Sequence, residues 1–84
     1  MPVLSKFCGI IIRMYFQQAE HNPPHIHALY EGEMAAIDVR TGGLLEGHLP
    51  SKALSMVKVW VGIHKNDLLH MWETQDFKPL SPLE

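Results

Sequence analysis

HIHALYEGEMAAIDV, residues 25–39, contains two short runs of strand-forming residues separated by the turn sequence Glu31-Gly32-Glu33. Each run fits a β-strand, and so short a connection joins strands that run antiparallel. Side chains alternate between the two faces of a strand, so His25 and His27 are expected on one face and the residues between and after them on the other. The segment therefore predicts a β-hairpin with two neighbouring imidazoles on one face.

The rest of the chain extends this hairpin in both directions. Strands are expected over residues 9–17, 25–30, 34–39 and 44–49. Alternation puts one set of side chains on a single face of the first strand and another on a single face of the last: Ile10, Ile12, Met14 and Phe16, and Leu45 and Leu49. After Pro50 the apolar residues, Trp60 and Trp72 among them, recur every three or four positions, which indicates a helix that ends near Thr74. Ser51 is expected to cap this helix, and Gly62 to bend it. We therefore expect an α+β fold, with an antiparallel sheet of about four strands followed by a long C-terminal helix packed on one face.

Length and composition limit the classes of protein. The 84 residues form a single domain, 1–84, in which residues 76–84 contain two prolines and are expected to be a flexible tail or to pack on a partner. A net charge of −2 argues against a strongly basic nucleic-acid binder, although a local basic patch stays compatible with RNA. A lone cysteine, Cys8, suits a reducing compartment. Without a signal peptide or a long apolar run, the sequence predicts a cytoplasmic protein that does not enter membranes.

Three histidines surround a Pro-Pro corner in the segment HNPPHIH, residues 21–27. Neutral imidazoles are common ligands of zinc and other divalent metals, and His25 and His27 point the same way on a strand. A metal site at these two residues would need a third ligand, for which the candidates are His21, Asp38, Glu46 and His48. Metal binding is therefore one interpretation of the cluster.

Acid–base chemistry without a metal is a second interpretation. His21, His25 and His27 can serve as acid or base, while Arg13, Arg40 and Tyr15 can hold a phosphate or stack on a base. A third interpretation is structural, with the histidines tying down the corner by hydrogen bonds to exposed carbonyls. Asp38, inside an apolar strand, either faces solvent or orients a histidine.

Several segments resemble a known family over nearly the whole chain, from Val3 to about Trp72. The segments are FCGIIIRMYF, HNPPHIH, AAIDVRTGGLLEGHLP and SKALSMVKVW, and they are similar to the small prokaryotic family known as domain of unknown function 4160. The resemblance implies a short single-domain protein, encoded beside another small protein in arrangements suggested to be toxin–antitoxin pairs. Matching positions are Arg13, His21, Asn22, Pro23, Pro24, His25, His27 and Asp38. The chain departs from the family pattern at residues 17–20 and at His48.

The combined interpretation is a toxin–antitoxin component that acts on RNA through a histidine and arginine cluster. The predicted catalytic residues are Arg13, His21, His25, His27 and Asp38. The alternatives are a non-catalytic protein-binding module and a metal-binding protein that uses the HNPPHIH histidines. The expected partners are a small cognate protein, a second copy of the chain, and RNA.

Overall fold

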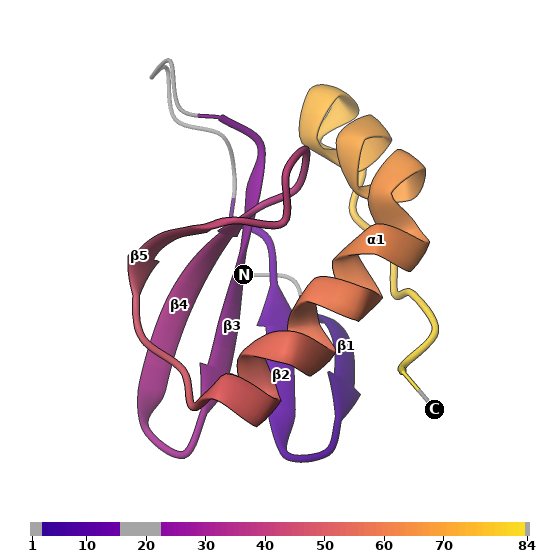
Figure 1. Ribbon diagram of the computed structural model, residues 1–84. Helices are drawn as coiled ribbons and strands as arrows, with labels where there is room; N and C mark the ends of the chain where they lie inside the picture. The colour runs from indigo at the N-terminus through magenta and orange to yellow at the C-terminus, as the bar shows by residue number, and fades with distance from the viewer. Residues whose placement is uncertain (1–2, 16–22, 84) are drawn as a thin grey trace.

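The computed structural model describes residues 3–15 and 23–83. They form a five-stranded antiparallel sheet and one long helix that crosses it (Figure 1). In chain order the elements are β1 (Val3–Phe7), β2 (Ile10–Arg13), β3 (His25–Tyr30), β4 (Glu33–Asp38), β5 (Leu44–Gly47) and α1 (Ser51–Thr74). The strands lie side by side in that same order, so the sheet is a meander. This confirms the expected α+β architecture, with one strand more than expected.

The additional strand is β1, which the sequence pattern did not predict. It pairs antiparallel with β2 across the turn Cys8-Gly9, where φ is 49° and 77°. The β3–β4 turn repeats this conformation at Glu31 and Gly32, with φ of 47° and 82°. Two-residue turns with positive φ at both positions match the twist of the strands that they join. Because cysteine rarely takes positive φ, the first of these turns has no clear signature in the sequence.

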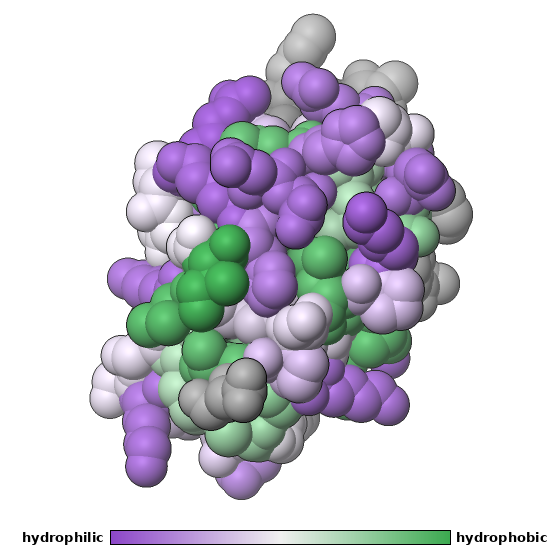
Figure 2. Space-filling view, turned by 90° about the vertical axis from the view of Figure 1, so that its right-hand side faces the viewer, coloured by the Kyte–Doolittle hydropathy of each residue, from purple (hydrophilic) through white to green (hydrophobic). Residues whose placement is uncertain are grey.

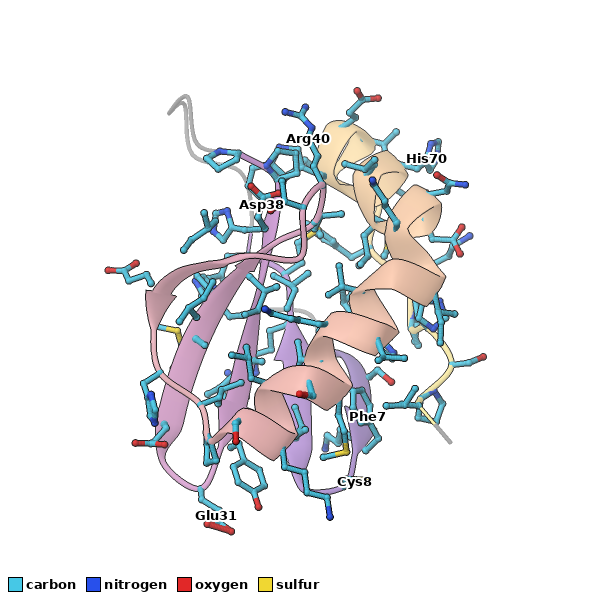
Figure 3. All side chains as sticks on the ribbon, in the orientation of Figure 1. Phe7, Cys8, Glu31, Asp38, Arg40 and His70 are labelled. Carbon is cyan, nitrogen blue, oxygen red and sulfur yellow. The ribbon has the colours of Figure 1, made fainter. Side chains whose placement is uncertain are left out.

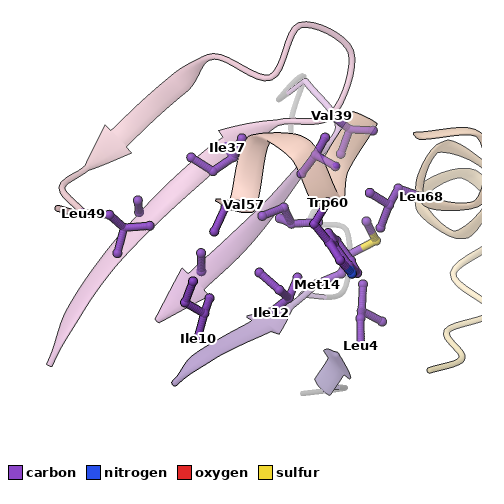
Figure 4. Packing of buried hydrophobic residues seen from close by; sticks show 14 of the residues in the cluster. Leu4, Ile10, Ile12, Met14, Ile37, Val39, Leu49, Val57, Trp60 and Leu68 are labelled. Carbon is purple, nitrogen blue, oxygen red and sulfur yellow. The ribbon is translucent and has the colours of Figure 1, made fainter. Parts of the chain in front are cut away.

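The hydrophobic core lies between the sheet and α1 (Figure 4). On β2 and just beyond it, Ile10, Ile12 and Met14 are fully buried, which confirms that they share the inner face. Phe16, predicted on the same face, lies outside the described residues. The other core residues with no exposed surface are Ile26, Ala28, Ala35, Ile37, Val39, Val57, Trp60, Leu68 and Met71. The side chains on one face of the sheet thus pack against the apolar stripe of α1 and form a single core layer.

α1 has the predicted extent but differs in two details. Its N-cap is Pro50, and no side chain caps it, because Ser51 already belongs to the helix. The break in helical geometry falls at His64 (φ −103°, ψ 15°) rather than at Gly62. The His64 ring contacts Trp60, and its Nε2 donates to the carbonyl of Ser81 at 2.9 Å, which holds it in place. Within the described ranges, no helix has the length and apolar character that a membrane span requires.

β5 is shorter than the strand predicted over residues 44–49. A register shift beside Ala36 of β4 leaves Leu45 as an extra residue, and Gly47, with φ of 83°, ends the strand. Leu45 and Leu49, predicted on one face, are therefore in different environments: Leu45 is 47% exposed and Leu49 is 2% exposed. The bulge breaks the simple alternation on which the prediction depended.

The segment after α1 folds back along the molecule. It leaves the helix at Gln75, which has a left-handed φ of 60°. The backbone N–H of Leu80 then donates to Leu4 O in β1 at 2.7 Å, and Trp60 Nε1 donates to Ser81 O at 2.9 Å. The face on the right-hand side of Figure 1 is largely hydrophilic, with hydrophobic patches between the polar groups (Figure 2). Residues 75–83 therefore pack against the chain's own core, a contact that the sequence does not reveal.

Candidate functional site

The predicted histidines lie on the face of the sheet opposite the core. Ile12 and Ile26 face α1, so alternation directs Arg13, His25 and His27 to the other face. Arg13 pairs with His27 in the β2–β3 register, and His27 pairs with Ala36 in β4, which pairs in turn with Glu46 in β5. Cross-strand partners share a face and lie close together. One row across four strands therefore contains a guanidinium, an imidazole and a carboxylate.

The imidazoles of His25 and His27 meet edge to face. Their ring centroids are 5.2 Å apart at an interplanar angle of 79°. Tyr15 lies against the other side of His27, with centroids 4.3 Å apart. His25 also reaches Trp72 near the end of α1, at 5.1 Å between centroids. The structure thus brings together the two histidines that strand alternation predicts on one face.

The Pro-Pro corner fixes the orientation of His25. Its Nδ1 lies 2.8 Å from the carbonyl oxygen of Pro23. A carbonyl only accepts hydrogen bonds, so Nδ1 carries a proton and donates it. In the neutral ring, Nε2 then has the free lone pair; in the charged ring, Nε2 has a second proton available for transfer. The corner therefore engages Nδ1 and leaves Nε2 as the ring nitrogen of His25 that does not bond to Pro23.

His27 is in a less polar environment. Its Nδ1 is buried without a hydrogen-bond partner among the described residues, and the same is true of Nε in Arg13. Burial lowers the pKa of His27 below its ordinary value, and neighbouring His25 lowers it further, while Glu46 acts in the opposite direction. His27 is therefore neutral at neutral pH, which suits a proton acceptor.

A pocket opens beside the ring of His25. It has a volume of about 350 Å³ and is lined by His25 and Pro23 from the corner, Ala36 from β4, and Leu45 and Glu46 from β5. This volume is at the lower end of the range for small-molecule sites. The pocket therefore gives a ligand the size of a nucleotide access to His25.

Asp38 is close to the cluster, and its carboxylate accepts hydrogen bonds from the loop that follows β4. It pairs with His25 in the β3–β4 register. Its Oδ1 accepts hydrogen bonds from the backbone N–H groups of Arg40, at 2.7 Å, and Thr41, at 3.2 Å. Asp38 and Arg40 lie at the same end of the sheet, where the β4–β5 loop approaches α1 (Figure 3). The carboxylate of Asp38 therefore holds this loop.

The described residues offer two imidazoles to a metal but no complete ligand set. In residues 3–15 and 23–83, no group of three His, Cys, Asp or Glu side chains is placed to hold a metal ion. Of the candidate third ligands, His48 is on the exposed surface, where its Nε2 lies 4.0 Å from Oε2 of Glu33. The carboxylate of Asp38 accepts hydrogen bonds from the loop backbone. His21 lies outside the described residues. A metal at His25 and His27 stays a prediction that depends on His21.

Two contacts of the site were not predicted. The stripe on α1 correctly places Trp72 in the core, where it is 8% exposed, but spacing alone does not place the end of the helix beside His25. The role of the Pro23 carbonyl also depends on the backbone conformation of the corner rather than on residue type. Both contacts restrain His25, so they are part of how the site is built.

Fold and site together define a small α+β protein with a histidine and arginine cluster on the open face of an antiparallel sheet. The chain belongs to the family described as Domain of unknown function (DUF4160), whose model matches residues 9–73. This confirms the family predicted from the sequence segments. A search of curated proteins and a search of solved structures each find no match to the chain.

Proposed function

We propose that the protein cleaves RNA without a metal, as the toxic component of a toxin–antitoxin pair. The observation that carries the proposal is the contact between His25 and His27, 5.2 Å apart on the open face, with Arg13 opposite His27 on the next strand. Metal-free RNA cleavage requires a base, an acid and a cation beside the phosphate, and this arrangement supplies all three.

In this mechanism His27 is the base and His25 is the acid. The lowered pKa of His27 keeps its imidazole neutral, so it can accept the proton of a ribose 2′-hydroxyl. The 2′-oxygen attacks the adjacent phosphorus, and the bond from phosphorus to the 5′-oxygen of the next nucleotide breaks. Charged His25, held through Nδ1 by Pro23, gives its Nε2 proton to that leaving oxygen. The products are a 2′,3′-cyclic phosphate and a 5′-hydroxyl.

The charges around the pocket favour one position for the phosphate. Glu46 lines the pocket on the β5 side, where its carboxylate repels a phosphate. Arg13 lies at the other end of the same row of side chains, beyond His27. The phosphate therefore belongs on the Arg13 side, where the guanidinium can stabilise the charge that develops during attack. Tyr15, whose ring contacts His27 at a tilt, offers an aromatic surface for a base.

The cognate partner is proposed to cover the β5 edge. β5 is the last strand in the sheet order β1-β2-β3-β4-β5, so its outer edge pairs with no other strand among the described residues. Leu44 and Leu45 of β5 are 44% and 47% exposed, Met34 of the neighbouring strand β4 is 40% exposed, and Leu45 also lines the histidine pocket. A small protein that adds a strand to β5 would bury these residues and close the pocket.

Inducible expression in a bacterial host tests the proposal. The wild-type protein should arrest growth and degrade cellular RNA, and a His25→Ala/His27→Ala variant should do neither. His70→Ala is the matched control, because His70 is exposed on α1 and has no contact with the cluster. Co-expression of a small protein encoded beside it should restore growth. Leu44→Ser, at an exposed residue of β5 that does not line the histidine pocket, should abolish this rescue without abolishing toxicity.

Two results would contradict the proposal. A harmless wild-type protein at high expression would favour a non-catalytic binding module. Toxicity that persists in the His25→Ala/His27→Ala variant would separate the growth effect from the cluster.

If the protein forms stable dimers through β5 instead, the β5 edge would be the contact between two copies. In that case Leu44→Ser/Leu45→Ser would convert the dimer to a monomer in sedimentation experiments.

A further inference from the structure

A second pocket lies away from the histidines, between the β4–β5 loop and the middle of α1. It has a volume of about 290 Å³, and its lining includes Arg40 and Thr41 from the loop and Lys58, Gly62 and Lys65 from the helix. Three of the seven Lys and Arg residues in a chain of net charge −2 therefore line one pocket. Its lining contains no acidic side chain.

The helix and the loop place these three cations independently. Lys58 and Lys65 line the pocket from the two sides of the break in helical geometry at His64. The loop fixes the backbone of Arg40, because Asp38 Oδ1 accepts a hydrogen bond from the Arg40 N–H. The backbone N–H of Asp38 also donates to Gly43 O at 2.8 Å. Among the residues that the structure describes, none of the three cations forms an ion pair. Their charges are available to a ligand.

Gly62 leaves room for a ligand in this pocket. It lies on the helix face between Lys58 and Lys65, and a Cβ built there would meet nothing within 4 Å. A glycine inside a helix costs about 1 kcal/mol relative to alanine, and at this position no neighbour requires the absence of a side chain. A larger side chain would project into the pocket. The glycine therefore keeps the space between the cations open.

We propose that this pocket, lined by Arg40, Lys58, Gly62 and Lys65, binds a phosphate group. An arginine fork with two lysine ammonium groups is a common set of phosphate ligands, and the lack of acidic lining favours an anion. The phosphate can belong to a free nucleotide or to an RNA strand. The proposal does not depend on RNA cleavage, because none of these residues belongs to the histidine cluster.

Isothermal titration tests the proposal, with pyrophosphate and adenosine monophosphate added to the wild-type chain. A short oligoribonucleotide is added to the His25→Ala/His27→Ala variant, which should not cleave it. Lys58→Gln/Lys65→Gln should weaken binding by about tenfold or more, and so should Gly62→Leu, which retains every charge but fills the space. Lys52→Gln is the matched control, because it removes one exposed lysine of α1 that does not line the pocket, and it should bind as the wild type does. Binding should also weaken as salt is raised.

The two sources of phosphate are distinguished by which probe binds more tightly. An oligoribonucleotide that binds more tightly than the mononucleotide indicates an RNA strand, whereas equal affinity indicates a free nucleotide. His25→Ala/His27→Ala should leave binding of pyrophosphate unchanged, which separates this site from the proposed cleavage site. The proposal is overturned if the wild type binds none of the probes, or if Gly62→Leu and Lys58→Gln/Lys65→Gln both bind as tightly as the wild type.

Discussion

Trp60→Ala should cost about 3–5 kcal/mol of folding free energy, the range for truncation of a large buried aromatic side chain. Trp60 has no exposed surface, and its ring stacks near Phe7 of β1 with centroids 6.1 Å apart. Loss of the indole N–H adds little, since Ser81 O would still accept a hydrogen bond from His64. A chain of this size has a total stability of about 4–13 kcal/mol, so the variant should be marginally folded.

Urea unfolding followed by circular dichroism measures this loss directly. Because Trp60→Ala can leave too little folded protein to fit, Trp60→Phe provides the second point. It keeps most of the apolar surface, and Ser81 O still accepts a hydrogen bond from His64, but the smaller ring leaves part of the buried site unfilled. We therefore expect a loss of about 1–2 kcal/mol and a fall in Tm of about 4–8 °C for each kcal/mol. A loss below about 1 kcal/mol for Trp60→Ala, with a cooperative transition, would show that α1 does not pack on the sheet through this residue.

Two further predictions follow from individual residues. The pKa of His27 is lower in the folded protein than the ordinary value of about 6.5 in the unfolded chain, so below that pH the unfolded chain binds a proton more readily. The free energy of unfolding should therefore fall as the pH drops from about 6.5 through the folded pKa, and His27→Gln should reduce this fall in unfolding titrations. An unchanged pH dependence of stability in the variant would assign the fall to other groups. Gly47→Ala should destabilise the fold by about 2 kcal/mol or more, because φ at Gly47 is 83° and the new Cβ would overlap the carbonyl of Met34. Gly62→Ala should instead stabilise the fold by up to about 1 kcal/mol, because alanine favours a helix and has room there. Similar effects of the two substitutions in thermal unfolding would contradict the packing at β5.

Much of the fold could be predicted because burial follows simple periods in this chain. Alternation correctly assigned Ile10, Ile12 and Met14 to the core, and the helical stripe correctly included Trp60. β1 was missed because its turn contains Cys8 at positive φ, which is not a recognisable turn signal. The extent of β5 was wrong because Gly47, with φ of 83°, ends the strand, and the predicted faces were wrong because the bulge breaks the alternation.

The candidate site was predictable only where it depends on local geometry. His25 and His27 are two residues apart on a strand, so their shared face follows from the pleat alone. The pairing of Arg13 with His27 depends on the register between β2 and β3, which the sequence does not fix. The phosphate pocket joins a loop to a helix through residues up to 25 positions apart, Arg40 and Lys65, and only the three-dimensional structure brings them together.

Cleavage of a short oligoribonucleotide by the purified protein tests the central proposal most directly. We expect products that end in a 2′,3′-cyclic phosphate, a rate maximum between about pH 5 and pH 8, and no effect of EDTA. His25→Ala and His27→Ala should each abolish cleavage, Arg13→Lys should impair it despite the retained charge, and His70→Ala should not change it. An equal rate on a substrate without 2′-hydroxyl groups, or loss of activity with EDTA and its recovery with zinc, would contradict cleavage by the His25 and His27 pair.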